Sequence, residues 1–345
     1  MTREPPFVHI LLLTWNGWQD TVDCLESLFR LDYPNFSVVV CDNASDDGSV
    51  EKIRGWAASG VPGASRPPEQ LRGLVDPPTP KPLAVREYTR EQAEAGGDLS
   101  APESRLTVIN TGRNLGFAGG NNVGLRYILA RGGDGLIWVL NNDILVARDS
   151  LSKLVECWES REGIGAVSGT LLYYTEPDRL QMAGGGRFMP WTGMATPTHT
   201  ESGRTPDYVT AGCMLVPASA VRRVGLLDER YFMYVEDVDY SLRLRRAGLS
   251  LVYCSAARAW HKGNVSVQVR SERHDYYTIR NSLMLAHRFY PALLPSVFAY
   301  TAYRCLLPKV LRGQFRRARA VLCGYRDFTQ RVVGPMPALA RNARQ

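Results

Sequence analysis

The chain has 345 residues, of which 45% are hydrophobic, and a net charge of +7 from 41 Lys and Arg against 34 Asp and Glu. These proportions exclude a disordered or collagen-like chain and supply enough apolar side chains for one large domain or two. No apolar run is long enough to predict a membrane-spanning helix.

The cysteines and the N-terminus bear on the cellular compartment. The seven cysteines are odd in number and scattered, and none forms a Cys-x-x-Cys pair. This distribution favours reduced thiols in an apolar core over a disulfide framework or a zinc site. The N-terminus shows no charged-then-apolar signal pattern, so we expect a cytoplasmic protein.

The first half of the sequence alternates between apolar runs of strand length and helical patterns. Continuous apolar runs are typical of strands buried on both faces of a parallel sheet. Strands are predicted at residues 7–14, 37–41, 106–110 and 136–140, with helices at 19–30, 49–56 and 123–130. This order predicts right-handed βαβ units and a doubly wound sheet.

Residues 60–104 interrupt the alternation with a composition rich in Pro and Gly. The closely spaced prolines at Pro67-Pro68, Pro77-Pro78 and Pro80-Lys81-Pro82 oppose regular strand ladders. We predict a flexible surface insertion within the domain.

Beyond about residue 160 the order of predicted elements becomes mixed. Strands are predicted at 166–173, 209–216 and 249–253, and Glu236 opens a helix. The remainder is helical in pattern and interrupted by prolines. We predict one α/β domain over residues 1–265 and a basic helical extension over residues 266–345.

The extension is strongly basic, because ten Lys and Arg residues from Arg304 onward accompany the single acid Asp327. Such a skew indicates nucleic acid or an anionic membrane surface as a partner. The chain lacks an aromatic-and-basic recognition motif, so no nucleic acid is expected. Residues 291–319 mix apolar and basic side chains, which predicts a segment that docks at the inner face of the cell membrane. A solvated basic face packed on the domain is an equal alternative.

Polar clusters follow four of the predicted strands. They are Thr14-Trp15-Asn16, Asp42-Asn43, Arg113-Asn114 and Asn141-Asn142-Asp143. In parallel sheets ligands bind beyond the carboxyl ends of the strands, so the clusters are expected along one edge. Together they offer a carboxylate for a base or ribose, a cation for phosphate, amides for hydroxyls and a ligand for a divalent cation, which suits a nucleoside diphosphate. Each cluster alone is also compatible with turn or surface chemistry.

A glycine-rich segment, Gly116-Phe117-Ala118-Gly119-Gly120, precedes the helix at 123–130. Its backbone N–H groups could approach a phosphate or a sugar, and a tight turn explains the glycines equally well. The segment is not G-x-G-x-x-G, and no glycine fingerprint follows the first strand. The dinucleotide-binding signature is therefore absent.

Five motifs follow one another between residues 7 and 262, and a sixth lies at residues 276–281. They are Leu13-Thr14-Trp15-Asn16, Val40 to Ser49, Asn114 to Asn122, Leu140-Asn141-Asn142-Asp143, Phe232 to Asp239 and Tyr276-Tyr277-Thr278-Ile279-Arg280-Asn281. This pattern resembles the glycosyltransferases of family 2, and most of all their rhamnosyltransferase-like bacterial branch.

The resemblance implies the GT-A fold, an α/β architecture with a doubly wound, Rossmann-like and mostly parallel sheet. It also implies a mixed half on the acceptor side and a C-terminal helical extension. The residues implied to bind the nucleotide sugar are Thr14, Asn16, Asp42, Asn43, Arg113, Asn114, Gly119, Asn122, Asn141 and Asn142. Processive members carry Gln-x-x-Arg-Trp and transmembrane helices, and neither is found here, so transfer of one or a few sugars is expected.

The family's D-x-D metal motif corresponds here to Asn141-Asn142-Asp143. The first acid is replaced by Asn, so Asp143 alone is carried over as a ligand for Mg²⁺ or Mn²⁺. The resemblance also implies that His261, which follows Trp260, completes the metal site. A hydrogen-bonded histidine at a strand end is the alternative reading of His261.

Glu236 and Asp237 are the predicted catalytic acids. An acceptor hydroxyl that attacks an anomeric carbon needs a base. Crowded carboxylates have raised pKa values and are better bases, and Asp239 adds to the crowding. The resemblance places the base at Asp237. The alternative is that these acids only complement the positive end of a helix.

The resemblance implies an inverting, metal-dependent hexosyltransferase of cell-wall or polysaccharide biosynthesis. Its donor would be dTDP-rhamnose or a UDP-sugar, and its acceptor a glycan or a lipid-linked glycan. Two alternatives remain open. A nucleotidyltransferase of similar fold would show a glycine- and lysine-rich first loop, which Thr14-Trp15-Asn16-Gly17 is not. The second alternative is a catalytically silent nucleotide- or glycan-binding subunit, and Asn141 in place of the first acid of the metal motif favours it.

Overall fold

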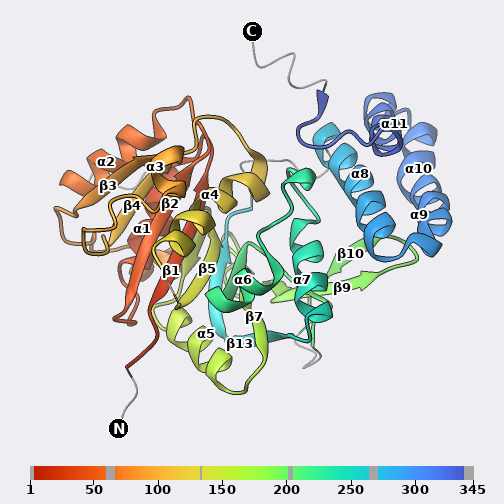
Figure 1. The fold of residues 1–345 in the computed structure, drawn as a ribbon. Coiled ribbons are helices and arrows are strands. Elements are labelled where there is room, and N and C mark those ends of the chain that lie inside the picture. The colour runs from red at the N-terminus through yellow and green to blue at the C-terminus, as the bar shows by residue number, and fades with distance from the viewer. Residues whose placement is uncertain (1–3, 60–66, 133, 201–204, 264–270, 338–345) are drawn as a thin grey trace.

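The computed structural model describes residues 4–59, 67–132, 134–200, 205–263 and 271–337. Ten of the described strands form one sheet in the order β3-β4-β2-β1-β5-β12-β7-β13-β6, with β8 paired to β7 (Figure 1). Helices cover both faces of this sheet, and further helices of the C-terminal region lie at the end of the molecule opposite α2 and β3.

The first half contains β1 (Val8–Thr14), α1 (Trp18–Leu28), β2 (Phe36–Asp42), α2 (Ser49–Ser59), β3 (Val85–Thr89), α3 (Arg90–Glu94), β4 (Leu106–Asn110), α4 (Gly116–Ala130) and β5 (Leu136–Asn141). Its five strands are parallel. Alternate residues of each strand pack on opposite faces: Leu12 lies in the cluster with α1 and α2, and Leu11 in the cluster with α4. The predicted doubly wound half is confirmed.

The second half contains β6 (Ile144–Val146), α5 (Ser150–Glu159), β7 (Ile164–Tyr173), β8 (Leu180–Ala183), β9 (Gly185–Met189), β10 (Met194–Pro197), β11 (Tyr208–Val209), β12 (Cys213–Pro217), α6 (Ala218–Val224), α7 (Glu236–Arg246) and β13 (Ser250–His261). Strand β12 runs antiparallel between β5 and β7, whereas β13 runs parallel to β7. Strands β10, β9 and β11 form a separate small sheet. The mixed half is therefore also confirmed.

The Pro-rich insertion is more regular than expected. Strand β3 pairs in parallel with β4 and forms an edge of the large sheet, and α3 follows it directly. Leu71 and Ala93 are buried. The expectation of a flexible surface insertion without regular ladders is wrong for residues 85–94, because no proline lies between Pro82 and Pro102 and these residues are free to pair. Residues 60–66 of the insertion lie outside the described part of the chain.

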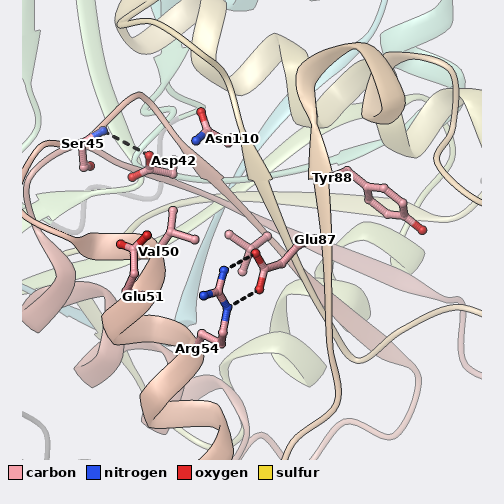
Figure 2. A pocket seen from close by; sticks show the side chains of 9 residues that line it. Asp42, Ser45, Val50, Glu51, Arg54, Glu87, Tyr88 and Asn110 are labelled. Carbon is pink, nitrogen blue, oxygen red and sulfur yellow. Dashed lines mark hydrogen bonds and ion pairs between the residues drawn. The ribbon is translucent and has the colours of Figure 1, made fainter.

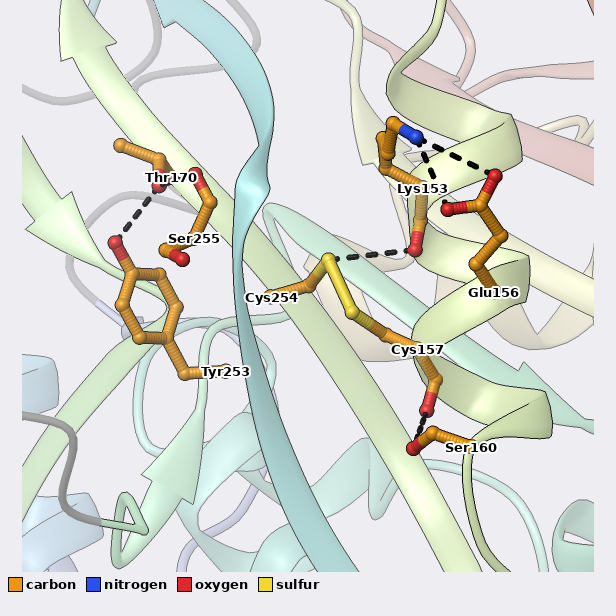
Figure 3. The surroundings of a disulfide bond; sticks show 8 residues. All are labelled: Lys153, Glu156, Cys157, Ser160, Thr170, Tyr253, Cys254 and Ser255. Atoms are coloured by element: carbon orange, nitrogen blue, oxygen red, sulfur yellow. Dashed lines mark hydrogen bonds and ion pairs between the residues drawn. A yellow bond between two sulfur atoms is a disulfide. The ribbon is translucent and has the colours of Figure 1, made fainter.

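A disulfide joins Cys157 of α5 to Cys254 of β13 (Figure 3). It fixes α5 against the sheet, beside the hydrogen bond from Ser160 to the Cys157 carbonyl. The expectation that all cysteines are reduced is wrong for this pair, whose partners lie far apart in the sequence. Cys24, Cys41 and Cys213 are buried free thiols.

The C-terminal region contains α8 (Glu272–Phe289), α9 (Leu294–Thr301), α10 (Leu307–Leu311) and α11 (Phe315–Thr329). Helix α11 packs on α8 through an apolar cluster that includes Ile279, Leu283 and Val321. The predicted helical extension is thus present, and its boundary with the α/β domain at residue 265 stays a prediction. No helix within the described residues is long and apolar enough to cross a membrane.

Candidate active site

The carboxyl ends of the parallel strands bring the predicted polar residues into one row. In the register of the sheet Thr14 lies opposite Asp42, Asp42 opposite Asn110, and Leu13 opposite Asn141. Because these residues lie at or next to the ends of their strands, the loops that follow also meet at this edge. The sheet therefore gathers the segments that the sequence predicts to bind a nucleotide sugar.

Asp42 lines a polar cavity of about 230 Å³ between α2, β3 and β4 (Figure 2). One carboxylate oxygen accepts a hydrogen bond of 3.1 Å from the Ser45 amide, and the other is buried without a partner among the described residues. Burial raises the pKa of Asp42. Arg54 and Glu87 form a bidentate ion pair, both contacts 2.6 Å, on the opposite wall. The cavity thus presents a free acceptor to a planar hydrogen-bond donor such as a base N–H.

Two predicted donor-binding asparagines instead support the loops. The Asn43 Nδ2 atom donates to Asn114 Oδ1 and to the Gly116 carbonyl at 3.1 and 3.2 Å, and its Oδ1 accepts from the Leu115 amide at 2.9 Å. These contacts tie the end of β2 to the start of α4. The Asn43 side chain therefore stabilises the segment that leads into α4 and does not present a free amide.

Asn122 has the same internal role on the other side of α4. It is fully buried, donates to the Leu227 carbonyl and Glu229 at 2.9 Å each, and accepts from the Leu227 amide at 3.0 Å. Both polar atoms are thereby used, which argues against direct contact with a donor. Gly119 lies close to this network, because a Cβ there would lie 3.7 Å from a carboxylate oxygen of Glu229.

Thr14, Asn16 and Asn142 order the loop after β1. The Asn142 Nδ2 atom donates to the hydroxyls of Thr21 and Thr14 at 2.9 and 3.3 Å. Asn16 adopts a φ of 51° and accepts from the Asp46 amide at 2.9 Å, joining the loops after β1 and β2. Arg113 and its neighbour Asn114 are exposed at the same edge.

Asp143 and His261 lie side by side at the ends of β5 and β13. The distance between His261 Nε2 and Asp143 Oδ1 is 3.2 Å, and the Gln181 carboxamide oxygen lies 2.8 Å from His261 Nδ1. Burial raises the pKa of Asp143, but the His261 contact and backbone hydrogen bonds, including that from Gly263, together outweigh it, so the net shift is downward. An ionised carboxylate beside an oriented imidazole nitrogen fits a divalent cation that takes its other ligands from a diphosphate and water. Within the described residues no group of three or more His, Cys, Asp or Glu gathers for a metal.

Lys262 is a charged neighbour that the sequence analysis did not identify. Its Nζ lies 2.7 Å from both Asp20 and Asp23 of α1. Its backbone amide also donates to the Asp143 carbonyl at 2.9 Å. These contacts fix the end of β13 against α1 and hence hold the Asp143–His261 pair. The only sequence signal was a basic residue directly after the predicted ligand.

Glu236 and Asp237 occupy the first turn of α7. Glu236 is buried, with one carboxylate oxygen lacking a partner among the described residues, and Asp237 is half-buried. Burial raises the pKa of both groups, and the proximity of Asp237 raises that of Glu236 further. The Asp237 carboxylate accepts a hydrogen bond of 2.8 Å from the Val238 amide. An oriented carboxylate with a raised pKa suits proton abstraction.

The Ala211–Gly212 segment connects the two halves of the site. The Ala211 backbone favours the charged form of the Asp237 carboxylate and lowers its pKa, and the Gly212 carbonyl accepts from the Asn141 amide at 3.0 Å. Asn141 begins the segment that carries Asp143. The segment beside the predicted base and the segment that leads to the predicted metal ligand are therefore neighbours at the end of β5.

Comparison with known proteins agrees with this architecture. Residues 86–280, more than half of the chain, match the family described as "Glycosyltransferase like family 2", and residues 9–66 match "Glycosyl transferase family 2". The matched ranges contain the Asp42 cavity, Asp143, Asp237 and His261.

Curated relatives are similar over part of their length. The chain is 25% identical over 206 residues to a low-salt glycan biosynthesis hexosyltransferase of Haloferax volcanii, covering 59% of this chain and 66% of the relative. It is 32% identical over 179 residues to an N-acetylglucosaminyl-diphospho-decaprenol L-rhamnosyltransferase of Mycobacterium tuberculosis, covering 45% and 58%. The chain thus spans less than two thirds of the length of either relative.

Solved structures share the fold. A mannosyltransferase from Pyrobaculum calidifontis, in complex with GDP-Man and Mn²⁺, superposes with a TM-score of 0.50 at 16% identity, covering 96% of this chain and 84% of the other. TarS from S. aureus, in complex with UDP-GlcNAc, gives 0.52 at 13% identity, covering 94% and 81%. The predicted GT-A fold is confirmed, and with the family matches it shows that the chain belongs to glycosyltransferase family 2.

Proposed function

We propose that the protein is an inverting, metal-dependent glycosyltransferase that moves a single sugar from a nucleoside-diphosphate sugar to an acceptor hydroxyl. The observation that carries the proposal is the position of the Ala211–Gly212 segment: the Ala211 backbone favours the charged form of the Asp237 carboxylate and lowers its pKa, and the Gly212 carbonyl accepts from the Asn141 amide, two residues before Asp143. This neighbourhood supports the proposal that a proton acceptor and a candidate metal ligand belong to one site.

In the proposed reaction Asp237 takes the proton of the acceptor hydroxyl while the oxygen of that hydroxyl forms a bond to the anomeric carbon. The bond from that carbon to the diphosphate oxygen breaks at the same time, and the diphosphate leaves with its electron pair. Attack from the opposite face inverts the configuration. A Mg²⁺ or Mn²⁺ ion held by Asp143 and His261 would supply the positive charge that stabilises the leaving diphosphate.

The donor proposal rests on the cavity and on the relatives. Asp42 offers an acceptor to the base, and exposed Arg113 offers a cation to the phosphates. The names of the M. tuberculosis relative and of a Shigella flexneri relative, 23% identical over 217 residues, specify rhamnosyl transfer. We propose dTDP-rhamnose as the favoured donor, with UDP-hexoses as the competing class, and a glycan or lipid-linked acceptor.

A thermal-shift screen tests the proposed donor site. Nucleoside diphosphates and their sugars are added with and without Mn²⁺, because selective binding stabilises the folded state. The proposal predicts a rise in Tm for one nucleotide that is larger with Mn²⁺. A flat response to every nucleoside diphosphate would contradict it.

We also propose that the C-terminal helices dock on an anionic membrane surface. Tyr303, Leu311 and Phe315 are 67%, 77% and 69% exposed, and Arg312 and Arg316 are exposed beside them. Apolar side chains that project among cations match the acyl boundary and headgroups of anionic lipid. Flotation should recover the protein with anionic vesicles at low salt and not with zwitterionic ones, and Leu311→Glu with Phe315→Glu should abolish recovery. Recovery independent of lipid charge would contradict the proposal.

A catalytically silent nucleotide- or glycan-binding subunit is the second candidate, favoured by Asn141 in place of the first acid of the metal motif. It predicts binding of the donor without release of nucleoside diphosphate. Release that requires both a divalent metal and Asp237 would exclude it.

A further inference from the structure

The segment before the catalytic acids has an unusual backbone. We call residues 232–235 the acid turn, because Glu236 and Asp237 follow it directly. Phe232, Tyr234 and Val235 have φ angles of 65°, 66° and 73°. Aromatic and β-branched residues rarely adopt such angles, which persist only where surrounding contacts impose them.

Those contacts come from α8. The Asn281 Nδ2 atom lies 3.0, 2.7 and 2.9 Å from the carbonyl oxygens of Tyr231, Met233 and Tyr234. Asn281 is fully buried. One side-chain amide therefore contacts three backbone carbonyls in and directly before the acid turn.

Arg280 holds that amide in place. Its Nε donates to Asn281 Oδ1 at 3.0 Å, which orients the carboxamide so that Nδ2 faces the turn. One Nη atom donates to the Tyr231 carbonyl at 2.9 Å, and the other donates to the Gly334 carbonyl at 2.6 Å. Arg280 is also fully buried, so its charge is spread over fixed carbonyl dipoles.

The opposite side of the acid turn contacts the start of α4. The Phe117 amide donates to the Phe232 carbonyl at 2.6 Å, and a Cβ at Gly116 would collide with the same oxygen. The Phe232 ring stacks on Tyr277, with centroids 5.6 Å apart. The turn is thus clamped between α4 and α8.

We propose that Arg280 and Asn281 are positioning residues that hold the acid turn and thereby place the Asp237 carboxylate for proton abstraction. The proposal rests on the proposed transferase function. It makes the C-terminal helical region part of the catalytic apparatus, and it gives the Tyr-Tyr-x-x-Arg-Asn motif a structural task.

The test compares Asn281→Asp with Leu283→Ala in the full chain. Asn281→Asp keeps the shape but replaces the donating nitrogen with an oxygen that faces three carbonyls. Leu283 is equally buried on the same helix, but it packs against Val297 and Val321, away from the turn. It therefore controls for general destabilisation of α8.

Asn281→Asp should lower kcat about 10- to 100-fold, the scale expected for a misplaced catalytic group, with the donor Kd unchanged. The acid limb of its pH profile should move to lower pH, because a loosened turn exposes Asp237. Hydrogen exchange should accelerate at residues 231–238. Leu283→Ala should show none of these three changes. Arg280→Lys should give smaller effects in the same direction, and it replaces Asn281→Asp if that variant does not fold.

Unchanged kcat in Asn281→Asp, or exchange at residues 231–238 equal to that of Leu283→Ala, would overturn the positioning role. A wild-type protein without transferase activity would instead overturn the proposed function. The exchange measurement needs no activity, so the two failures are distinguishable.

Discussion

His261 Nε2 lies 3.2 Å from Asp143 Oδ1, although Asp143 follows β5, which is not a neighbour of β13 in the sheet. The contact forms because β6 turns back after Asp143 and pairs with the end of β13, where Ile144 lies opposite His261. A carboxylate and an imidazole from distant parts of the chain thus meet beside the proposed diphosphate site.

His261→Ala should reduce kcat/KM at least about tenfold and raise the concentration of Mn²⁺ needed for half-maximal activity, because one of two protein ligands is lost. Titration of activity with Mn²⁺ measures both effects. His199→Ala is the matched control, since His199 is exposed and its Nδ1 contacts the backbone carbonyl of Gln181. An unchanged Mn²⁺ requirement in His261→Ala would remove His261 from the metal site.

Asp42→Ala should raise the donor KM about 10- to 100-fold with little change in kcat. The variant loses a charged acceptor for the nucleobase of the donor, and this contact stabilises the bound donor and the transition state equally. Steady-state kinetics with the preferred donor measure the split. Asp46→Ala, an exposed acid in the same loop, should leave both constants near wild type. A loss confined to kcat would contradict the assignment of the Asp42 cavity as the binding site of the nucleobase.

The activity should depend on pH through Asp237. A base must be ionised, and burial raises the pKa of this carboxyl. The acid limb of kcat/KM should therefore lie above the range near pH 4 that is ordinary for Asp. A pH–rate profile of the free enzyme measures the limb, and an activity that is already maximal near pH 4 would be inconsistent with a buried base.

The same pKa shift affects stability. Because the folded state binds the Asp237 proton more tightly than the unfolded state, this group lowers the free energy of unfolding progressively as pH rises from about 4 through the folded pKa. Asp237→Asn should remove that penalty. Urea unfolding at two pH values should show the variant gaining stability over wild type as pH rises, and a gain that is independent of pH would refute the linkage.

Glu26→Ala should destabilise the fold by about 3–5 kcal/mol, because it leaves a buried cation and donors without their partner. Glu26 accepts from Trp56 Nε1 and the Thr79 amide at 2.7 Å each and lies 3.5 Å from Lys81 Nζ. Urea denaturation measures the loss, with exposed Glu69→Ala as the control. Equal stability of the two variants would show that Glu26 does not anchor the insertion.

The sequence permits prediction of those parts of the site that depend on local pattern. Each apolar run of the parallel half ends where its polar cluster begins, so Thr14, Asp42 and Asn141 were expected at one edge, and the register confirms it. The strand ends alone fix this row, because the sheet is parallel. Individual ligand roles at these positions stay predictions.

Contacts between distant segments could not be predicted. Asn43 and Asn122 were expected to face the donor, but their amides are used by Gly116 and Leu227, which only the folded chain brings near. The pairing of Cys157 with Cys254 depends on the packing of α5 against β13 in the same way. The link from Asn281 to the acid turn likewise has no signature in local periodicity.

The most direct test of the proposed reaction is release of nucleoside diphosphate from dTDP-rhamnose or a UDP-sugar with Mn²⁺ and a lipid-linked acceptor, measured for wild type and Asp237→Asn. We expect release by wild type and none by Asp237→Asn, although the variant still binds the donor. Near-normal release by Asp237→Asn would contradict the assignment of Asp237 as the base.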